Sequence, residues 1–400
     1  MGLNIENIKS EFPIFDESNL IYLDNASTTQ KPKTVIDSIQ AMYTESNANV
    51  HRAIYDLGSK ATERYENSRS KVKKFINAPS EKEIIFTKGT TESINLLGNT
   101  IGSSLKPGDK ILITEMEHHA NIVPWQMACE RTGAQLNYIP IDINGELDLS
   151  NPDKLFSEAT KIISVTHVSN VLGTINPIKK LSKIAKSLGA IFVVDGAQGV
   201  PHQPVDVQDL SCDFYAFSGH KMLGPTGVGV LWGKTEILDQ MEPFMGGGEM
   251  IKTVTMESST WNDLPYKFES GTPNFVQAVG LGTAIDFMED IGMDVIYDHE
   301  RKLTNYALST LKDIKGLHIL GSAKNRNGVI SFYIDGIHAH DLAQFLNEDN
   351  IAIRVGHHCA QPLLSSLGQT SAARISLYIY NNQSDIDIFR DSVEKIKRYF

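Results

Sequence analysis

Short apolar, β-branched runs alternate with stretches of helical periodicity between about residues 83 and 233. The runs are nearly continuous in apolar character, as expected of strands that are covered on both faces. This alternation predicts an α/β fold with a mainly parallel seven-stranded sheet covered by helices. The seven runs are, in chain order, EIIF, KILIT, QLNYIPI, KIISVTH, AIFVVD, DFYAFS and GVGVLWG.

The pattern changes in the last third of the chain. The Gly- and Pro-rich link before GVGVLWG is too short for a helical crossover, so we expect an antiparallel edge strand or insertion there. Residues 274–312 predict two long helices, and a smaller α+β unit follows them. We therefore expect a large α/β domain over 25–280, and a small α+β domain formed by 1–24 and 281–400.

Composition and charge narrow the classes of partner. With 400 residues, 41% of them hydrophobic, the chain can bury a large core. Its 37 basic and 48 acidic residues give a formal net charge of -11, which argues against nucleic acid as a partner. The sequence shows neither a signal peptide nor a run of about 18 apolar residues, so we expect a cytoplasmic protein that does not bind a membrane.

Two ionisable residues end buried-looking strands. Asp195 closes the run AIFVVD, at the sheet edge where open α/β sheets bind ligands, although Asp–Gly is also a common turn. Lys221 follows DFYAFS; most lysines are solvated, but a desolvated amine with a lowered pKa can form a Schiff base. Together they suit pyridoxal 5'-phosphate, because a carboxylate keeps the ring nitrogen protonated and a lysine binds the aldehyde. Ser218 and His220 flank the lysine as candidate phosphate ligands.

Two more strand ends carry residues that suit the same cofactor. Thr90 and Thr91, in KGTTES, follow EIIF and open a predicted helix whose N–H groups can hold a phosphate. A plain Thr N-cap is the simpler interpretation of that motif alone. EMEHHAN follows KILIT, and one of its imidazoles can lie on a pyridine ring. Four such strand ends in succession favour a cofactor site.

The chain has three cysteines, too few and too far apart for a disulfide framework or a CxxC zinc site. Cys359, in RVGHHCAQP, is either a reactive thiol or a buried structural one, as we expect Cys129 and Cys212 to be in their apolar stretches. A metal site is a third interpretation, which we disfavour because adjacent histidines on an extended segment point to opposite sides. Its ligands would come from His338, His340, His357, His358 and Cys359.

Taken in order, the motifs resemble those of the cysteine desulfurases of the class V aminotransferase group, and among these the SufS-like branch. The resemblance runs from about Asp24 to Arg374 and rests on GTTE, EHHANIVPW, THVSNVLGT, VDGAQ, FSGHKMLGPTGVG, FESGTPN and RVGHHCAQP. It implies a homodimer of fold type I that uses pyridoxal 5'-phosphate to take sulfur from L-cysteine and leave L-alanine. It also implies that a SufE-like or SufU-like acceptor protein collects the sulfur for iron–sulfur cluster assembly.

The resemblance implies a role for each candidate residue. Lys221 would bind the cofactor and move the Cα proton, and Cys359 would take up the sulfur as a persulfide. Asp195 would pair with the ring nitrogen, Gln198 with the ring hydroxyl, and His118 would stack on the ring. The implied phosphate ligands are Thr90 or Thr91, Ser218, His220 and, from the other subunit, Thr272. The implied substrate-binding residues are Arg374, Asn170, Arg354 and His51.

Two other functions stay open from the sequence. Selenocysteine lyases and cysteine sulfinate desulfinases use the same scaffold and differ in how strictly they need the thiol. A non-catalytic sulfur-assembly subunit would keep the fold for partner binding, and we would expect it to lack the lysine or the aspartate. Lys221 and Asp195 are both present, which favours an enzyme.

Overall fold

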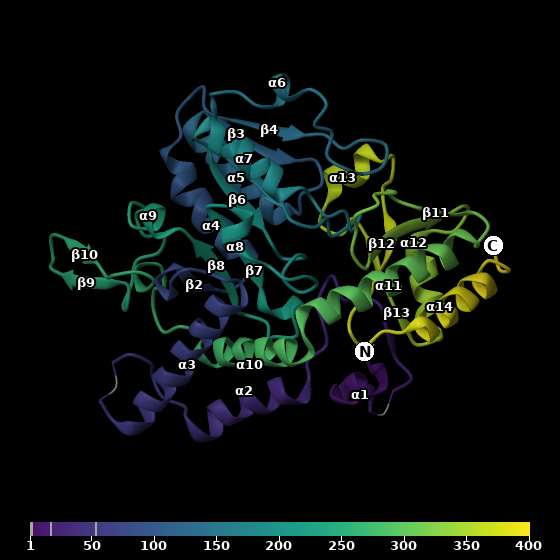
Figure 1. Cartoon of the computed structure of the whole chain (residues 1–400), viewed down its shortest axis with the longest axis horizontal. Helices are drawn as coiled ribbons and strands as arrows, with labels where there is room; N and C mark the ends of the chain where they lie inside the picture. The colour runs from purple at the N-terminus through teal and green to yellow at the C-terminus, as the bar shows by residue number, and fades with distance from the viewer. Residues whose placement is uncertain (1–2, 17, 53) are drawn as a thin grey trace.

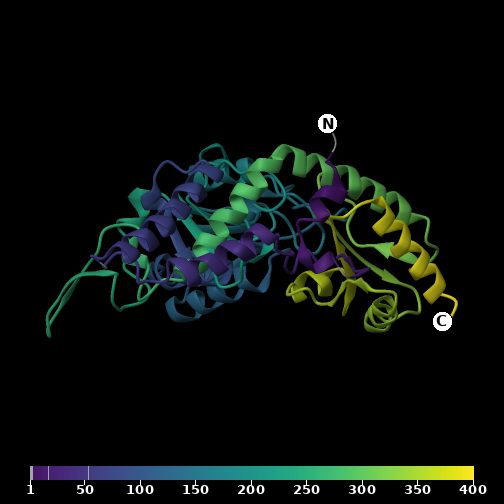
Figure 2. The same ribbon diagram turned by 90° about the horizontal axis from the view of Figure 1, so that it is seen from below.

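The structure is a computed structural model that describes residues 3–16, 18–52 and 54–400. Two units lie side by side in Figure 1, a large one around a long sheet and a smaller one near both chain ends. Seen from below in Figure 2, helices α10 (Phe275–Ile291) and α11 (Met293–Lys312) run from the large unit into the small one. These are the two long helices predicted over 274–312.

The large unit is built on a seven-stranded sheet, as the sequence predicts. Each of the seven predicted runs forms one strand, and their spatial order is β2-β8-β7-β6-β5-β3-β4. The strands are β2 (Ile84–Thr87), β3 (Lys110–Thr114), β4 (Gln135–Ile139), β5 (Thr160–Thr166), β6 (Ile191–Asp195), β7 (Phe214–Ser218) and β8 (Gly229–Gly233). The fold class is therefore confirmed.

Strand β8 is the one strand of this sheet that runs antiparallel to its neighbours, which are β2 and β7. The short Gly- and Pro-rich link after β7 explains its direction, since no helical crossover fits there. The expectation of an edge position was wrong, because β2 pairs with the outer side of β8. As a result β2, β3, β6 and β7 all point the same way, and their carboxyl ends meet at one edge of the sheet.

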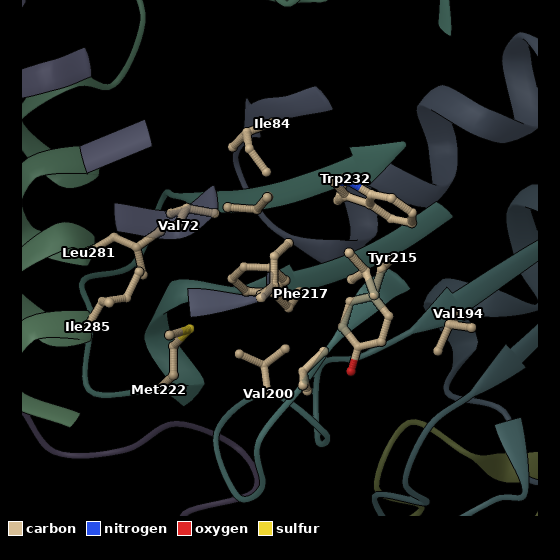
Figure 3. Packing of buried hydrophobic residues seen from close by; sticks show 14 of the residues in the cluster. Val72, Ile84, Val194, Val200, Tyr215, Phe217, Met222, Trp232, Leu281 and Ile285 are labelled. Carbon is tan, nitrogen blue, oxygen red and sulfur yellow. The ribbon is translucent and has the colours of Figure 1, made fainter. Parts of the chain in front are cut away.

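Alternate residues of each strand pack against helices on opposite faces of the sheet. Tyr215 and Phe217 of β7 belong to the core cluster on the face covered by α3 and α10, and in Figure 3 Phe217 lies between Tyr215 and the α10 residues Leu281 and Ile285. Phe214 faces the other layer, formed by α4 and α5. Fully burying such a side chain contributes roughly 1.5–3 kcal/mol. The helices of the large unit are α2 (Lys33–Glu45), α3 (Asp56–Phe75), α4 (Thr90–Asn99), α5 (Val123–Thr132), α6 (Pro152–Leu155), α7 (Ile178–Leu188), α8 (Val207–Leu210) and α9 (Thr235–Leu238).

The small unit packs a four-stranded sheet of order β11-β12-β15-β14 against α11, α12 and α14. Its elements besides α11 are β1 (Ile21–Tyr22), β11 (Leu317–Ile319), β12 (Val329–Ile334), α12 (Ala339–Glu348), β13 (Ile351–Ala352), β14 (Arg354–Gly356), α13 (Gln361–Ser366), β15 (Ala372–Ser376) and α14 (Gln383–Ile396). The N-terminal helix α1 (Ile5–Lys9) packs through Ile8 against the core of the large unit. Strand β1 joins the small unit by pairing with β13, and Asp24 forms a bridge to Ser376. The domain limits, 25–280 for the large domain and 1–24 with 281–400 for the small one, stay predictions.

A hairpin of β9 (Ile251–Val254) and β10 (Ser259–Trp261) extends away from the large unit in both views. It follows the glycine cluster at 246–248. Of the two cysteines expected to be buried, Cys212 is fully buried, but Cys129 is only partly so because it lies toward the outer side of α5. No helix within the described ranges is long and apolar enough to cross a membrane.

Candidate active site

The carboxyl ends of β2, β3, β6 and β7 open into a cavity of about 230 Å³. All the predicted site residues except His51 and Thr272 line it. Those that do are Thr90, Thr91, His118, Asn170, Asp195, Gln198, Ser218, His220, Lys221, Arg354, Cys359 and Arg374. The cavity therefore joins residues from the large sheet to residues of the small unit.

Asp195 is the last residue of β6, where it lies beside Ala216 of the adjacent parallel strand β7, and Lys221 ends the 3₁₀ turn Gly219–Lys221 that follows β7. Asp195 is 3% exposed, and burial raises the pKa of its carboxyl group. One carboxylate oxygen accepts a hydrogen bond from the backbone N–H of Ala197, and the positive charge of Lys221 also favours the ionised form. A buried carboxylate of this kind requires a cationic partner in the cavity.

Burial lowers the pKa of Lys221 from 10.5 to about 8. The positive charge of Arg374 adds to this effect, and the negative charge of Asp195 opposes it. At pH 7 about one such amine in ten is neutral, against fewer than one in a thousand for a free lysine. Lys221 is thus a usable nucleophile near neutral pH.

We expect the rate at which apoprotein takes up pyridoxal 5'-phosphate to rise about tenfold per pH unit below pH 8 and to level off above it. The reason is that only the neutral amine of Lys221 attacks the aldehyde. Rapid-mixing absorbance spectroscopy measures this rate, and Nα-acetyl-lysine serves as the control because its reaction keeps accelerating toward pH 10. A protein profile that follows the control would contradict the lowered pKa.

His118 follows β3 and stands before the 3₁₀ turn His119–Asn121. Its Nδ1 accepts the backbone N–H of Ala120 at 3.0 Å, so the proton is on Nε2. Burial, reinforced by the positive charge of Lys221, lowers its pKa to about 3. His118 therefore presents a neutral ring to the cavity.

Ser218 and Thr90 form a polar group at the start of α4. Ser218 Oγ accepts the backbone N–H of Thr90 at 2.9 Å and lies 2.8 Å from Thr90 Oγ1. Gly89, not a threonine, is the N-cap of α4, so the simple Thr N-cap interpretation was wrong. This arrangement leaves hydroxyl groups at a positive helix terminus, which suits a phosphate. His220, whose pKa is lowered to about 4 mainly by burial, lines the same end.

One buried polar atom is suited to a hydroxyl group of a ligand. Gln198 is 2% exposed; its Nε2 donates to the carbonyl of Ala26 at 2.6 Å, but its Oε1 is buried without a hydrogen-bond partner. An unpaired amide oxygen in such a place costs about 1–3 kcal/mol. A hydroxyl group on a bound aromatic ring would satisfy it. Together with Asp195, Lys221 and the hydroxyl groups at α4, this donor set fits pyridoxal 5'-phosphate.

Arg374, in β15 of the small unit, lines the same cavity and is 2% exposed. Its guanidinium donates to Asn170 O at 2.9 Å, Asp24 Oδ1 at 3.1 Å and Ser27 Oγ at 2.8 Å, while its buried Nε has no partner. Arg354, opposite Arg374 on β14, is exposed. The two arginines supply positive charge suited to a substrate carboxylate.

Cys359 stands at the mouth of the cavity and is exposed, unlike a structural thiol. Its φ of 54° and that of His358, 52°, are both left-handed, which costs roughly 1–2 kcal/mol per non-glycine residue. The side-chain amide of Asn170 donates to His358 O at 2.6 Å and helps to hold this turn. Within the described part of the chain, no three His, Cys, Asp or Glu side chains are placed to bind a metal.

His51 and Thr272 lie outside this cavity. His51 Nε2 contacts Glu66 Oε1 at 2.8 Å, and Glu66 also pairs with the buried Arg69. Thr272 is exposed and lines a separate hollow beside Asn274. The role implied for Thr272 places it in the site of a second subunit, so its role and that of His51 stay predictions.

Sequence reasoning missed the segment after β1, which closes one side of the cavity. Ala26 and Ser27 line it, and Asp24 pairs with Arg374. The signal was the polar run DNASTT directly after the apolar IYL, at a strand end like the others. His358 was not among the predicted cofactor-binding or substrate-binding residues, yet its buried ring also lines the cavity.

Fold and site together define a pyridoxal phosphate-dependent enzyme of fold type I. Residues 21–389 match the family described as Aminotransferase class-V, and the chain belongs to this family. A probable cysteine desulfurase of Halalkalibacterium halodurans is 51% identical over 100% of this chain and 99% of its own length. The cysteine desulfurase of Haloferax volcanii is 45% identical, over 100% and 98%. The apo structure of a cysteine desulfurase from Thermococcus onnurineus NA1 superposes with a TM-score of 0.96 at 39% identity, covering 100% of this chain and 99% of that one.

Proposed function

We propose that this chain is a cysteine desulfurase that moves the sulfur of L-cysteine onto Cys359 and releases L-alanine. The observation that carries the proposal is that an exposed thiol shares one cavity with Lys221 and Asp195. Transfer of an amino group alone needs no thiol, whereas removal of sulfur needs an acceptor for it. The names of the full-length relatives support the same activity.

The proposed holoenzyme holds its cofactor through residues of the large sheet. When bound, pyridoxal 5'-phosphate draws electrons from the substrate and makes its Cα proton acidic. Asp195 would hold the ring nitrogen, Gln198 Oε1 the ring hydroxyl, and the neutral His118 ring would cover one face. The phosphate would be bound at the start of α4, by Thr90 or Thr91, Ser218 and His220.

Arg374 would bind the substrate carboxylate, assisted by Asn170 and by the exposed Arg354. To do so Arg374 must share or exchange its present partner Asp24, whose carboxylate lies 3.1 Å from the guanidinium. With its lowered pKa, the Lys221 amine would accept the Cα proton of the bound substrate. These two residues thus fix the substrate and start the reaction.

Cys359 completes the transfer as a thiolate. Its sulfur bonds to the substrate sulfur while the substrate Cβ–S bond breaks, and the electron pair of that bond stays on the carbon skeleton. Protonation of Cβ then gives alanine, and Cys359 keeps the sulfur as a persulfide. The net change is one thiol and one L-cysteine converted to one persulfide and one L-alanine.

The proposal includes partners that collect the sulfur. An exposed persulfide at the cavity mouth is accessible to a SufE-like or SufU-like acceptor protein in the cytoplasm, which would deliver the sulfur to iron–sulfur cluster assembly. A homodimer is also part of the proposal. It is supported by exposed apolar side chains such as Ile54 and Tyr55, beside the segment that carries His51.

The test incubates the cofactor-loaded protein with L-cysteine and measures alanine, together with the mass of the peptide that carries Cys359. We expect equal amounts of alanine and of a 32-Da addition, which is one sulfur atom, in the first turnover. Parallel incubations with selenocysteine and cysteine sulfinate separate the sibling activities. Cofactor uptake without any alanine would instead favour a non-catalytic sulfur-assembly subunit.

A further inference from the structure

The thiol loop, residues 357–361, is held in a conformation that its sequence does not favour. His358 and Cys359 both have left-handed backbone angles, which glycine adopts far more readily. Contacts from outside the loop must offset this strain if the sulfur is to stay at the cavity. Hydrogen bonds to the loop come from Asn170, already described, and from His119.

His119 contacts the thiol loop twice. Its backbone N–H donates to Cys359 O at 2.7 Å, and its Nε2 accepts the backbone N–H of Gln361 at 3.1 Å. Gln361 is the first residue of α13, so this N–H is one of the helix amides that have no partner within the helix. The next residue, Pro362, supplies no N–H. The His119 imidazole therefore caps α13 and ties it to the end of β3.

We propose that His119 is a positioning residue, whose imidazole acceptor holds the thiol loop so that Cys359 faces the cofactor cavity. His119 directly follows His118, which lines that cavity, so a shift of the loop relative to His119 is a shift of the sulfur relative to the cofactor site. The inference rests on the proposed function, because positioning the sulfur matters only if sulfur is transferred.

The proton on His119 must lie on Nδ1, because Nε2 accepts the hydrogen bond. Burial lowers the pKa of His119, and a positive charge on His357 lowers it further, so the acceptor stays available at neutral pH. The ionisable neighbours are His118, His357 and Cys359. None of them supplies a carboxylate that would favour a charged imidazole.

Two substitutions of similar size separate the effect of the hydrogen-bond acceptor of His119 from the effect of its side-chain packing. His119→Gln keeps an amide oxygen near the position of Nε2, whereas His119→Leu fills the space without an acceptor. We expect His119→Leu to slow persulfide formation in a single turnover about tenfold, and His119→Gln to recover most of the rate. Cofactor absorbance and its change on adding L-cysteine should match the wild type in both variants, because His118 and Lys221 are untouched.

Amide hydrogen exchange tests, independently of catalysis, whether His119 restrains the thiol loop. Peptides that cover 355–366 should exchange faster in the holoprotein of His119→Leu than in the wild type or His119→Gln. Equal exchange and equal transfer rates in all three proteins would overturn the proposal, and so would two variants that are equally slow. If the wild type forms no persulfide, the proposed function fails, while the exchange comparison still decides whether His119 holds the loop.

Discussion

Lys221→Ala is expected to lose turnover of L-cysteine by a factor of about a thousand or more. The substitution removes both the amine that binds the cofactor and the group that accepts the Cα proton. Its effect is large because Lys221 is placed beside Asp195 in the cavity with a pKa lowered to about 8. Alanine release at saturating L-cysteine and cofactor measures the loss.

Lys183→Ala provides the matched control, since Lys183 is exposed on α7 and does not line the cavity. Its activity should stay within twofold of the wild type. Thermal unfolding of both variants shows whether they fold. A folded Lys221→Ala protein with an unchanged rate of alanine release would contradict the cofactor-dependent mechanism.

Cys359→Ala is expected to lower steady-state alanine production by about a hundredfold or more, because the substrate sulfur then has no thiol to accept it. Cofactor uptake and the absorbance change on adding L-cysteine should persist, since Cys359 lies at the cavity mouth and acts after the proton transfer. Alanine assays and absorbance spectra of the same samples separate the two steps.

Cys129→Ala is the control for a general effect of removing a thiol. Cys129 is partly buried in α5, and burial raises its pKa, so it is a poor nucleophile. This variant should keep its rate and its persulfide on Cys359. Full alanine production by Cys359→Ala would show that another group accepts the sulfur.

The sequence was enough to predict the large sheet because its strands are buried on both faces and read as continuous apolar runs. Residues at the ends of those strands, such as Asp195, Lys221 and His118, could be placed together because parallel strands end at one edge. The antiparallel direction of β8 could also be predicted from the short link that precedes it. Its interior position in the sheet could not be predicted, because the spatial order of strands depends on packing that the local sequence does not encode.

The parts of the site that escaped prediction depend on contacts between distant segments. Asp24 and Ser27 meet Arg374 only after the small unit folds, and no local pattern indicates such a contact. The left-handed angles at His358 and Cys359 were equally hidden, because neither position holds glycine, the residue that adopts such angles most readily. Where tertiary contacts impose a backbone conformation, the conformational propensity of the residue does not predict it.

Strand β1 pairs with β13, and Arg374 donates a hydrogen bond to Asp24. These two contacts have a consequence for biosynthesis. During translation, the segment that closes one side of the cavity is synthesised roughly 330–350 codons before its partners. Contacts of such high sequence separation form slowly. A nascent chain can thus complete its large sheet while this side of the cavity remains open, so it should become able to bind substrate only after residues 351–374 have been synthesised.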